Sequence, residues 1–336
     1  MIIVRAPLRI SFVGGGSDLP DFYKTYPGRV ISTTFNKYVY VAINSTPIIE
    51  NVTARYSKFE IVSHARELKN DRMRAALLDL GIYKNIDIAT FSDLPVKTGL
   101  GGSSSFSVAL LKGLYTYLGE KTDSRNIAEA ACRLEIELLK EPIGKQDQYA
   151  SAFGGFNVFQ FNADDTVDAE PVFLDYKKRL DFENHLLLFF TGITRLDSSV
   201  LKGQKKNIPK RLDTLKRMSD SVEEFKKQLL NGNFERLGEL IHENWKNKRT
   251  LASNVSSSFI DNLYEVGIKN GAWGGKILGA GGGGCILFIV PPKSKELVRA
   301  AIRRRARKEG LKNLREISVS FVQSGVEILM NHPIRS

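Results

Sequence analysis

The sequence predicts an α+β protein in two halves, and three observations carry this prediction. Strand-like segments dominate the first 60 residues, and segments with apolar residues at helical spacing dominate the region from 196 to 270. The chain is also longer, at 336 residues, than one ordinary domain. We therefore expect two domains, at residues 1–180 and 181–336.

The first half reads as strands followed by helices. Apolar segments bounded by turn residues predict strands at 1–5, 9–13, 30–34, 38–44, 52–56, 86–90 and 156–161. Helical spacing of apolar residues predicts helices at 71–80, 103–118 and 125–139. The polar stretch at 162–168 is typical of a turn.

The second half is richer in helical patterns. Predicted helices cover 196–230, 234–252, 257–270 and 295–308. Predicted strands cover 186–191, 276–278, 285–290 and 317–321. These strands are separated by helices, so we expect a second, smaller α+β unit.

The net charge of +12 favours an anionic partner, which could be nucleic acid, a membrane surface or a phosphorylated small molecule. The basic clusters at 202–217 and 299–312 lie in helical patterns without aromatic residues for base stacking, so we expect solvated helix faces and disfavour nucleic acid. No apolar run approaches the roughly 20 residues of a membrane span, and no signal peptide is visible, so we expect a cytoplasmic protein.

The most informative segment lies at 95–105, where a glycine-rich loop opens a predicted helix. Glycines let backbone N–H groups face an anion, and the helix N-terminus adds partial positive charge, which together suit a di- or triphosphate. One serine hydroxyl can cap the helix and another can bind Mg²⁺. The expected nucleotide-binding residues are Pro95, Gly99, Leu100, Gly101, Gly102, Ser103, Ser104 and Ser105.

Two further glycine-rich loops have weaker signals. The loop at 279–284 satisfies Gly-x-Gly-x-x-Gly, but a strand follows it instead of a helix, so a dinucleotide site is not supported. Its glycines favour close backbone approach to a ligand or to another loop. In the loop at 14–18, Asp18 is either a turn residue or an acceptor of hydrogen bonds from sugar hydroxyls.

Two carboxylates stand out beside the predicted phosphate loop. A phosphoryl transferase needs a carboxylate for its metal and a group that orients or deprotonates the acceptor hydroxyl. Glu135 and Asp147 are the candidates. The four histidines lack metal-ligand spacing, and the two cysteines cannot form a disulfide framework.

Three motifs in this order, at 6–18, 95–105 and 276–284, resemble the GHMP small-molecule kinases. The resemblance implies a ribosomal-S5-like N-terminal domain and a ferredoxin-like C-terminal domain, with ATP between them. It also implies Mg²⁺ held by Ser103 and Glu135. Ser104 and Glu137 remain rivals for these positions, because the alignment has one substitution and one apparent insertion.

The resemblance assigns catalysis to Asp147, with Arg9 near the reacting hydroxyl. The residues implied to bind substrate are Arg9, Gly15, Gly16, Ser17, Asp18, Asp147, Gly281, Gly282 and Gly283. The segments 5–20 and 144–149 are most similar to family members that phosphorylate the anomeric hydroxyl of D-glycero-D-manno-heptose 7-phosphate, and a phosphorylated sugar fits the basic charge. Candidates for binding the 7-phosphate are Lys145, Arg195 and Lys205.

Two alternatives remain open. A related kinase for fucose or another hexose would share the same motifs. A basic RNA-binding protein with an S5-like fold and no catalysis would share the charge, although it would gain little from carboxylates beside a phosphate loop. A homodimer is also left open.

Overall fold

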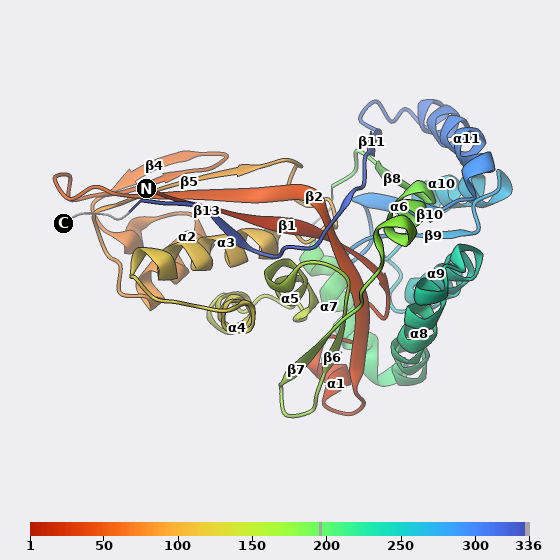
Figure 1. The fold of residues 1–336 in the computed structure, drawn as a ribbon, viewed down its shortest axis with the longest axis horizontal. Coiled ribbons are helices and arrows are strands. Elements are labelled where there is room, and N and C mark those ends of the chain that lie inside the picture. Colours follow the sequence, from red (N-terminus) through yellow and green to blue (C-terminus); the bar gives the residue numbers. More distant parts are fainter. Residues whose placement is uncertain (195–196, 333–336) are drawn as a thin grey trace.

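The structure is a computed structural model and describes residues 1–194 and 197–332. In that part of the chain the strands form a nine-stranded sheet and a four-stranded sheet, with helices packed on both (Figure 1). The predicted α+β class is confirmed.

Two long antiparallel strands form the centre of the nine-stranded sheet. Where the sequence predicts pairs of short strands, the chain forms uninterrupted β1 (Ile2–Val13) and β2 (Gly28–Ser45). Their register shifts between Pro7 and Leu8, where proline has no N–H to donate. The other strands of this sheet are β3 (Val52–Arg55), β4 (Phe59–Val62), β5 (Ile86–Ser92), β6 (Asn157–Phe161), β7 (Val167–Pro171), β12 (Phe321–Val322) and β13 (Glu327–Asn331).

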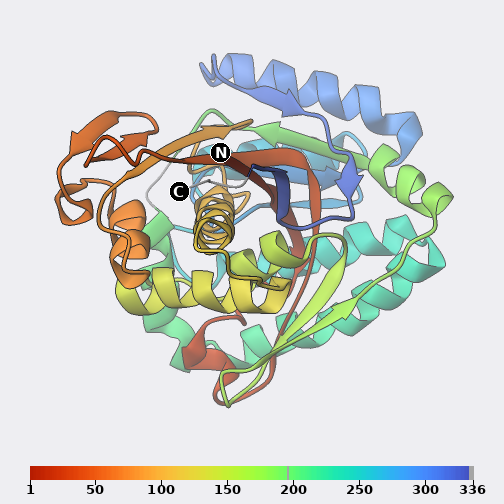
Figure 2. The same ribbon diagram turned by 60° about the vertical axis from the view of Figure 1, so that its left-hand side comes forward.

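Helices cover one face of this sheet, and Figure 2 shows α3 almost end-on beneath the strands. They are α2 (Asp71–Asp79), α3 (Gly102–Tyr117), α4 (Ser124–Cys132) and α5 (Gln146–Phe153). The predicted helix at 125–139 is two segments, because α4 continues into the π-helix η2 (Arg133–Leu138). Shorter helices are α1 (Pro20–Tyr23), η1 (Ala65–Glu67) and α6 (Tyr176–Asn184). Neither α5 nor α6 is predicted from the sequence.

The four-stranded sheet has the order β11-β8-β10-β9. Its strands are β8 (Leu186–Phe190), β9 (Gly274–Ile277), β10 (Cys285–Ile289) and β11 (Arg315–Ile317). Its helices are α7 (Asp197–Asn207), α8 (Leu212–Asn231), α9 (Phe234–Arg249), α10 (Ser258–Lys269) and α11 (Lys295–Lys308), with short turns η3 (Ile208–Lys210) and η4 (Pro292–Ser294). The predicted helix at 196–230 is interrupted at η3, because Pro209 cannot continue an α-helix.

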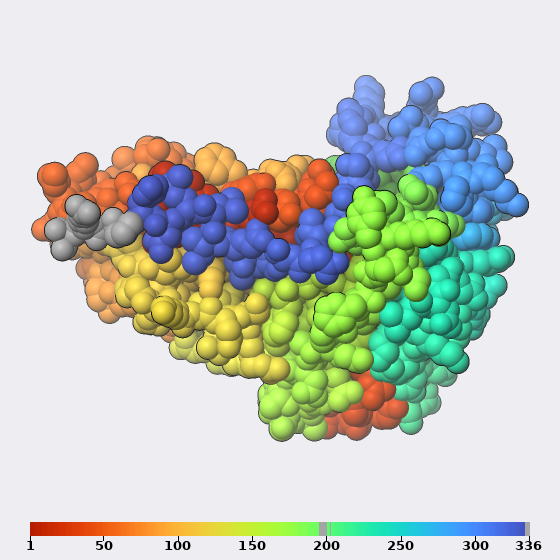
Figure 3. Space-filling model, in the orientation of Figure 1, coloured from red at the N-terminus to blue at the C-terminus, as the bar shows by residue number. Residues whose placement is uncertain are grey.

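The end of the described chain returns to the first sheet. There β12 pairs with β2 and β13 pairs with β1, and the Arg5 Nε donates to Glu327 at 2.8 Å. Figure 3 shows this segment lying across the surface of the N-terminal half. Residue 180 therefore lies near the change of sheets, but 321–331 belong to the first sheet, which the sequence does not predict. The division into 1–180 and 181–336 stays a prediction.

One apolar core joins the two halves. Phe12 of β1 packs against Phe225 of α8, with ring centroids 5.2 Å apart. The same cluster includes Leu188 of β8 and Leu287 of β10. Burying these side chains holds the end of β1 against the second sheet. The loop that follows β1 is thereby fixed between the two halves.

Candidate active site

A cavity of about 800 Å³ opens between the two halves. The expected site residues among its lining are Arg9, Gly16, Asp18, Pro95, Gly99, Gly101, Gly102, Ser103, Ser104 and Asp147. A cavity of this size lies in the range of small-molecule and cofactor sites. The first and middle motifs, far apart in sequence, therefore converge on one cavity.

Arg9 and Asp147 form a bidentate ion pair at the wall of this cavity. The Arg9 Nε donates to Asp147 Oδ1 at 2.8 Å, and its Nη2 donates to Oδ2 at 2.7 Å. The Nη1 donates to the carbonyl of Gly99 at 2.6 Å. The Arg9 side chain is 4% exposed and that of Asp147 is 25% exposed. Because the guanidinium is held on three sides, it fixes a carboxylate that solvent and ligands can reach.

The loop before α3 presents the N-terminus of this helix to the cavity. Gly101 stands at the N-cap in the left-handed conformation, with φ of 77°, and no side chain caps the helix. Ser103 is exposed and lines the cavity. The first N–H groups of a helix have no intrahelical partner, so they are available to an anion at this position.

Two of the expected nucleotide residues hold the loop instead of lining the cavity. Leu100 is buried, and its carbonyl accepts from the Arg9 backbone N–H at 3.0 Å. The Ser105 hydroxyl is buried and donates to the carbonyl of Pro7 at 2.9 Å. Both contacts attach the phosphate loop to β1.

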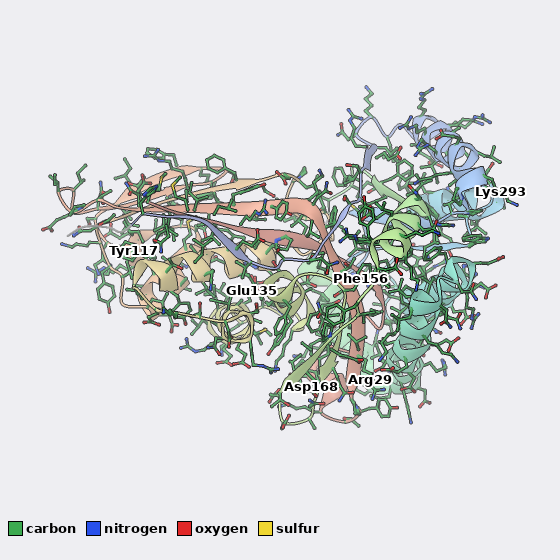
Figure 4. All side chains as sticks on the ribbon, viewed as in Figure 1. Arg29, Tyr117, Glu135, Phe156, Asp168 and Lys293 are labelled. Atoms are coloured by element: carbon green, nitrogen blue, oxygen red, sulfur yellow. The ribbon has the colours of Figure 1, made fainter. Side chains whose placement is uncertain are left out.

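Glu135 is completely buried at the centre of a hydrogen-bonded cluster. Its Oε2 accepts from the Ser104 hydroxyl at 2.8 Å and from Gln148 Nε2 at 2.5 Å. Its Oε1 accepts from the Ser107 hydroxyl at 2.7 Å and from Arg72 Nε at 3.3 Å. Figure 4 labels Glu135 among the helices near α5. One carboxylate therefore ties the phosphate-loop helix to the helix that carries Asp147.

The π-helix places the two rival carboxylates in different surroundings. In η2 the N–H of Leu139 bonds to the carbonyl of Leu134, five residues back. Glu135 then faces α3, whereas Glu137 is exposed. The serine that contacts Glu135 is Ser104, whereas Ser103 faces the cavity.

The oxygen donors in this cluster match the chemistry of Mg²⁺. This ion takes hydroxyl and carboxylate oxygens, usually with only one or two carboxylates and several waters. The Ser104 hydroxyl and the Glu135 carboxylate already lie in contact, and Ser103 is the next residue of the same turn. The residues present therefore fit this ion.

Asp18 lies at the other end of the Arg9–Asp147 pair. It is 3% exposed, and its carboxylate accepts from the backbone N–H groups of Gly16, at 3.2 Å, and Gln146, at 3.3 Å. Burial, with a smaller effect from the charge of Asp147, raises the pKa of Asp18 above its ordinary value. Any side chain at Gly144 would clash, because its Cβ would lie 2.0 Å from Asp18 Oδ2.

The other expected residues of this loop point elsewhere. The Ser17 hydroxyl is buried and donates to the carbonyl of Arg29 at 2.9 Å. Gly15 is not part of the cavity wall, although a Cβ there would lie 4.0 Å from Lys248 Nζ. Within this loop, Gly16 and Asp18 line the cavity.

The third glycine-rich loop packs on the phosphate loop. The Cys285 N–H donates to the carbonyl of Thr98 at 2.8 Å. A Cβ on Gly99 would lie 2.5 Å from the carbonyl oxygen of Leu278. The sequence leaves open a ligand or another loop as the reason for these glycines. The structure shows close contact with another loop, and Gly279 also lines the cavity.

Gly281, Gly282 and Gly283 are not part of the cavity wall. The Gly282 N–H donates to the carbonyl of Val255 at 2.8 Å, and a Cβ on Gly283 would meet the carbonyl of Ile193. The expectation that these three glycines contact substrate is not supported by their position.

Comparison with known proteins identifies the family. Residues 62–155 match the GHMP kinases N-terminal domain, and residues 225–308 match the GHMP kinases C-terminal domain. The two matches together cover more than half of the chain. The chain belongs to the GHMP kinase family. It is therefore a kinase, a phosphotransferase with an alcohol group as acceptor.

This GHMP kinase has relatives that match along nearly its whole length. It is 29% identical to the D-glycero-alpha-D-manno-heptose 7-phosphate kinase of Campylobacter jejuni, over 90% of this chain and 93% of that protein. It is 28% identical to the bifunctional fucokinase/GDP-fucose pyrophosphorylase of Arabidopsis thaliana, over 88% of this chain but 30% of that longer protein.

The fold matches solved structures of the family. The structure of a D-glycero-D-manno-heptose 1-phosphate kinase from Bacteriodes thetaiotaomicron superimposes with a TM-score of 0.81 and 24% identity, covering 99% of this chain and 100% of that one. The galactokinase of Lactococcus lactis gives a TM-score of 0.78 at 16% identity, covering 98% of this chain and 95% of that one. The two-domain α+β fold expected from the resemblance is confirmed.

The lysines expected to bind a substrate phosphate lie outside the cavity wall of this GHMP kinase. The Lys145 Nζ donates to the carbonyl of Asp165 at 2.8 Å, and Lys205 pairs with Asp21 at 3.4 Å. Arg195 lies outside the described residues. The cationic side chains that line the cavity in the described part of the chain are Arg9, Arg72, Lys97 and Lys248.

Sequence reasoning misses an apolar wall of the cavity. Phe91 and Val96 line it and are 64% and 72% exposed, and Tyr56 and Phe106 line it too. Exposed large apolar side chains beside a cavity indicate a surface for a flat apolar group such as a nucleobase. Nothing in the local sequence pattern distinguishes these residues from ordinary strand and turn residues.

None of the described helices has the length and apolar character that a membrane span requires.

Proposed function

We propose that this protein transfers the γ-phosphoryl group of ATP to the anomeric hydroxyl of D-glycero-D-manno-heptose 7-phosphate, giving the 1,7-bisphosphate used to make nucleotide-activated heptose. The observation that carries the proposal is the position of Asp147. Its carboxylate is accessible, fixed by Arg9, and faces the same cavity as the N-terminus of α3. The similarity to the Campylobacter jejuni enzyme along 90% of the chain supports the choice of sugar.

In the proposed reaction, the sugar oxygen O1 forms a bond to the γ-phosphorus as the bond from that phosphorus to the β–γ bridging oxygen breaks, and ADP leaves. Asp147 orients the hydroxyl and accepts its proton. Arg9 holds Asp147 and stabilises the charge that develops on the transferred group. Because phosphoryl-transfer transition states are loose, positioning of the hydroxyl by Asp147 matters more than removal of its proton.

The backbone at Gly101 to Ser103 binds the phosphates of the nucleotide through the N–H groups of the first turn of α3. Mg²⁺, when bound, neutralises charge on the phosphate oxygens. Ser104 and Glu135, with Ser103, are the residues that would hold it. Asp18, whose buried carboxylate lines the same cavity, accepts hydrogen bonds from sugar hydroxyls.

The phosphate of the substrate needs a cation at this end of the cavity. Lys248 lines the cavity beside Gly15, and its ammonium group also donates to the carbonyl of Gly279. We assign it, in place of Lys145 and Lys205, as the cation that attracts the 7-phosphate.

The test is coupled ADP release from Mg·ATP over a panel of acceptors. The panel holds D-glycero-D-manno-heptose 7-phosphate, unphosphorylated heptose, mannose 6-phosphate, fucose, galactose and mevalonate. Preference for heptose 7-phosphate is expected. Faster turnover of an unphosphorylated sugar would support kinase activity but contradict heptose 7-phosphate as the substrate.

A fucose kinase is the second candidate, because the Arabidopsis thaliana fucokinase matches 88% of this chain. The fucose arm of the panel tests it directly. An RNA-binding protein without catalysis would instead show no ADP release and a steep loss of RNA affinity with salt. The accessible Asp147 carboxylate facing the phosphate loop is the observation against that reading.

A further inference from the structure

Arg72 connects the cavity to the buried carboxylate of Glu135. It extends from α2, lines the cavity, and its side chain is 22% exposed. Its Nε lies 3.3 Å from Glu135 Oε1, and its Nη2 donates to Glu141 Oε2 at 2.7 Å. The Arg72 guanidinium therefore pairs with two carboxylates, and that of Glu135 has no exposed surface.

The charge of Glu135 has one cationic partner among the residues that the structure describes. Its other contacts, with Ser104, Ser107 and Gln148, are neutral. A buried carboxylate without a cation is strongly unfavourable. Arg72 is therefore the described side chain whose positive charge faces the buried Glu135 carboxylate.

We propose that Arg72 is a positioning residue that holds the charge of Glu135 until Mg²⁺ arrives, and so sets the Mg²⁺ concentration at which nucleotide binds. This inference rests on the proposed function, because it takes Glu135 as a ligand of the nucleotide-bound metal. A cation 3.3 Å from a carboxylate opposes the approach of a second cation to it. Once Mg²⁺ takes over the charge of Glu135, the guanidinium stays paired with Glu141.

The inference predicts two effects of opposite sign for Arg72→Gln. Removing the competing cation strengthens Mg²⁺ binding at Glu135. Removing a positive charge from the cavity wall weakens the binding of nucleotide phosphates in the absence of metal. A general loss of structure would weaken both.

The experiment is calorimetric titration of the full chain with ADP, first with EDTA and then at a series of Mg²⁺ concentrations. For R72Q we expect the Mg²⁺ concentration for half-maximal ADP binding to fall about 5- to 20-fold, in the usual range for coupled binding events. Metal-free ADP should bind more weakly than to wild type. R72K, which keeps the charge, should lie close to wild type.

Two further variants complete the design. Arg74→Gln is the matched control, because Arg74 lies on the same helix but pairs with Asp71, away from Glu135. Glu141→Gln should shift the Mg²⁺ requirement upward, since Arg72 then pairs with Glu135 alone. This variant keeps the inference testable if R72Q does not fold.

The outcomes separate the inference from the function on which it rests. A wild-type protein that binds ADP with Mg²⁺, while R72Q shows the same or a higher Mg²⁺ requirement, would overturn the role of Arg72 alone. A folded wild-type protein that binds no ADP with or without Mg²⁺ would overturn the proposed function, and the inference with it.

Discussion

Two glycine-rich loops meet in this protein, and Gly102 of one and Gly284 of the other have different surroundings. In the loop at 99–105, the position of Gly102 leaves room, since the nearest atom to a Cβ there would be a Leu8 methyl at 3.7 Å. In the loop at 279–284, a Cβ on Gly284 would lie 2.5 Å from the carbonyl oxygen of Thr98. The backbone at Gly102 has open space around it, whereas Gly284 lets two backbones touch. Glycine content alone therefore does not identify a binding loop.

The largest effect is expected at Asp147, the carboxylate that we propose as catalytic. Asp147→Asn should lower kcat by about 10²- to 10⁴-fold, the usual scale for acid–base groups. The amide keeps an acceptor for Arg9, so the protein should stay folded. Steady-state ADP release measures the effect, with Asp168→Asn on β7, labelled in Figure 4, as the control. An unchanged kcat would contradict a role for Asp147 in the reaction.

A substitution in the loop at 279–284 should lower the stability of the folded protein. Gly284 has a φ of +85°, so Gly284→Ala combines backbone strain with a clash and should lower the free energy of unfolding by about 2–3 kcal/mol. Gly119→Ala is the control, because Gly119 has a similar φ of +78° with nothing within 4 Å of a Cβ. Urea denaturation compares the two variants. Equal losses would show that close packing of the loops contributes nothing.

The buried carboxylate of Asp18 predicts a pH effect. Burial raises the pKa of Asp18, so the folded protein favours the protonated form, and its stability falls as pH rises through the raised value. Asp18→Asn should remove this fall and be more stable than wild type at pH 7, with weaker substrate binding. Denaturation at pH 3 and pH 7 measures the difference, and a variant that is less stable at pH 7 contradicts the prediction.

The smallest effect is expected at the open position of the first loop. Gly102→Ala should change the free energy of unfolding by no more than about 0.5 kcal/mol, because the added methyl meets no close neighbour. The same methyl should weaken ADP binding if phosphates approach this backbone. A stability loss as large as that of Gly284→Ala would contradict the claim that Gly102 is less tightly packed than Gly284.

The parts of the site that local patterns describe were predictable. The loop at 99–105 follows a strand and opens a helix, and Arg9, Asp18 and Asp147 meet at the cavity as the motifs imply. The burial of Glu135 and the exposure of Glu137 depend on the wider backbone turn of the π-helix η2, which hydrophobic spacing does not reveal.

Long-range contacts explain the remaining differences. The backbone approach of Gly284 to Thr98 joins segments that lie far apart in the sequence. Strand β12 spans only two residues, and β13 has no fully buried residue to give it the alternating pattern of a half-buried strand. Arg72 and Phe91 line the cavity because of where α2 and β5 lie in the fold. None of these positions follows from local periodicity.

The most direct test of the central claim is ³¹P NMR of the reaction mixture. With Mg·ATP and D-glycero-D-manno-heptose 7-phosphate, we predict ADP together with a new phosphate ester on the anomeric carbon, in equal amounts, and none with Asp147→Asn on the same time scale. ADP with free phosphate and no new ester, or an ester on another hydroxyl, would contradict the proposed transfer.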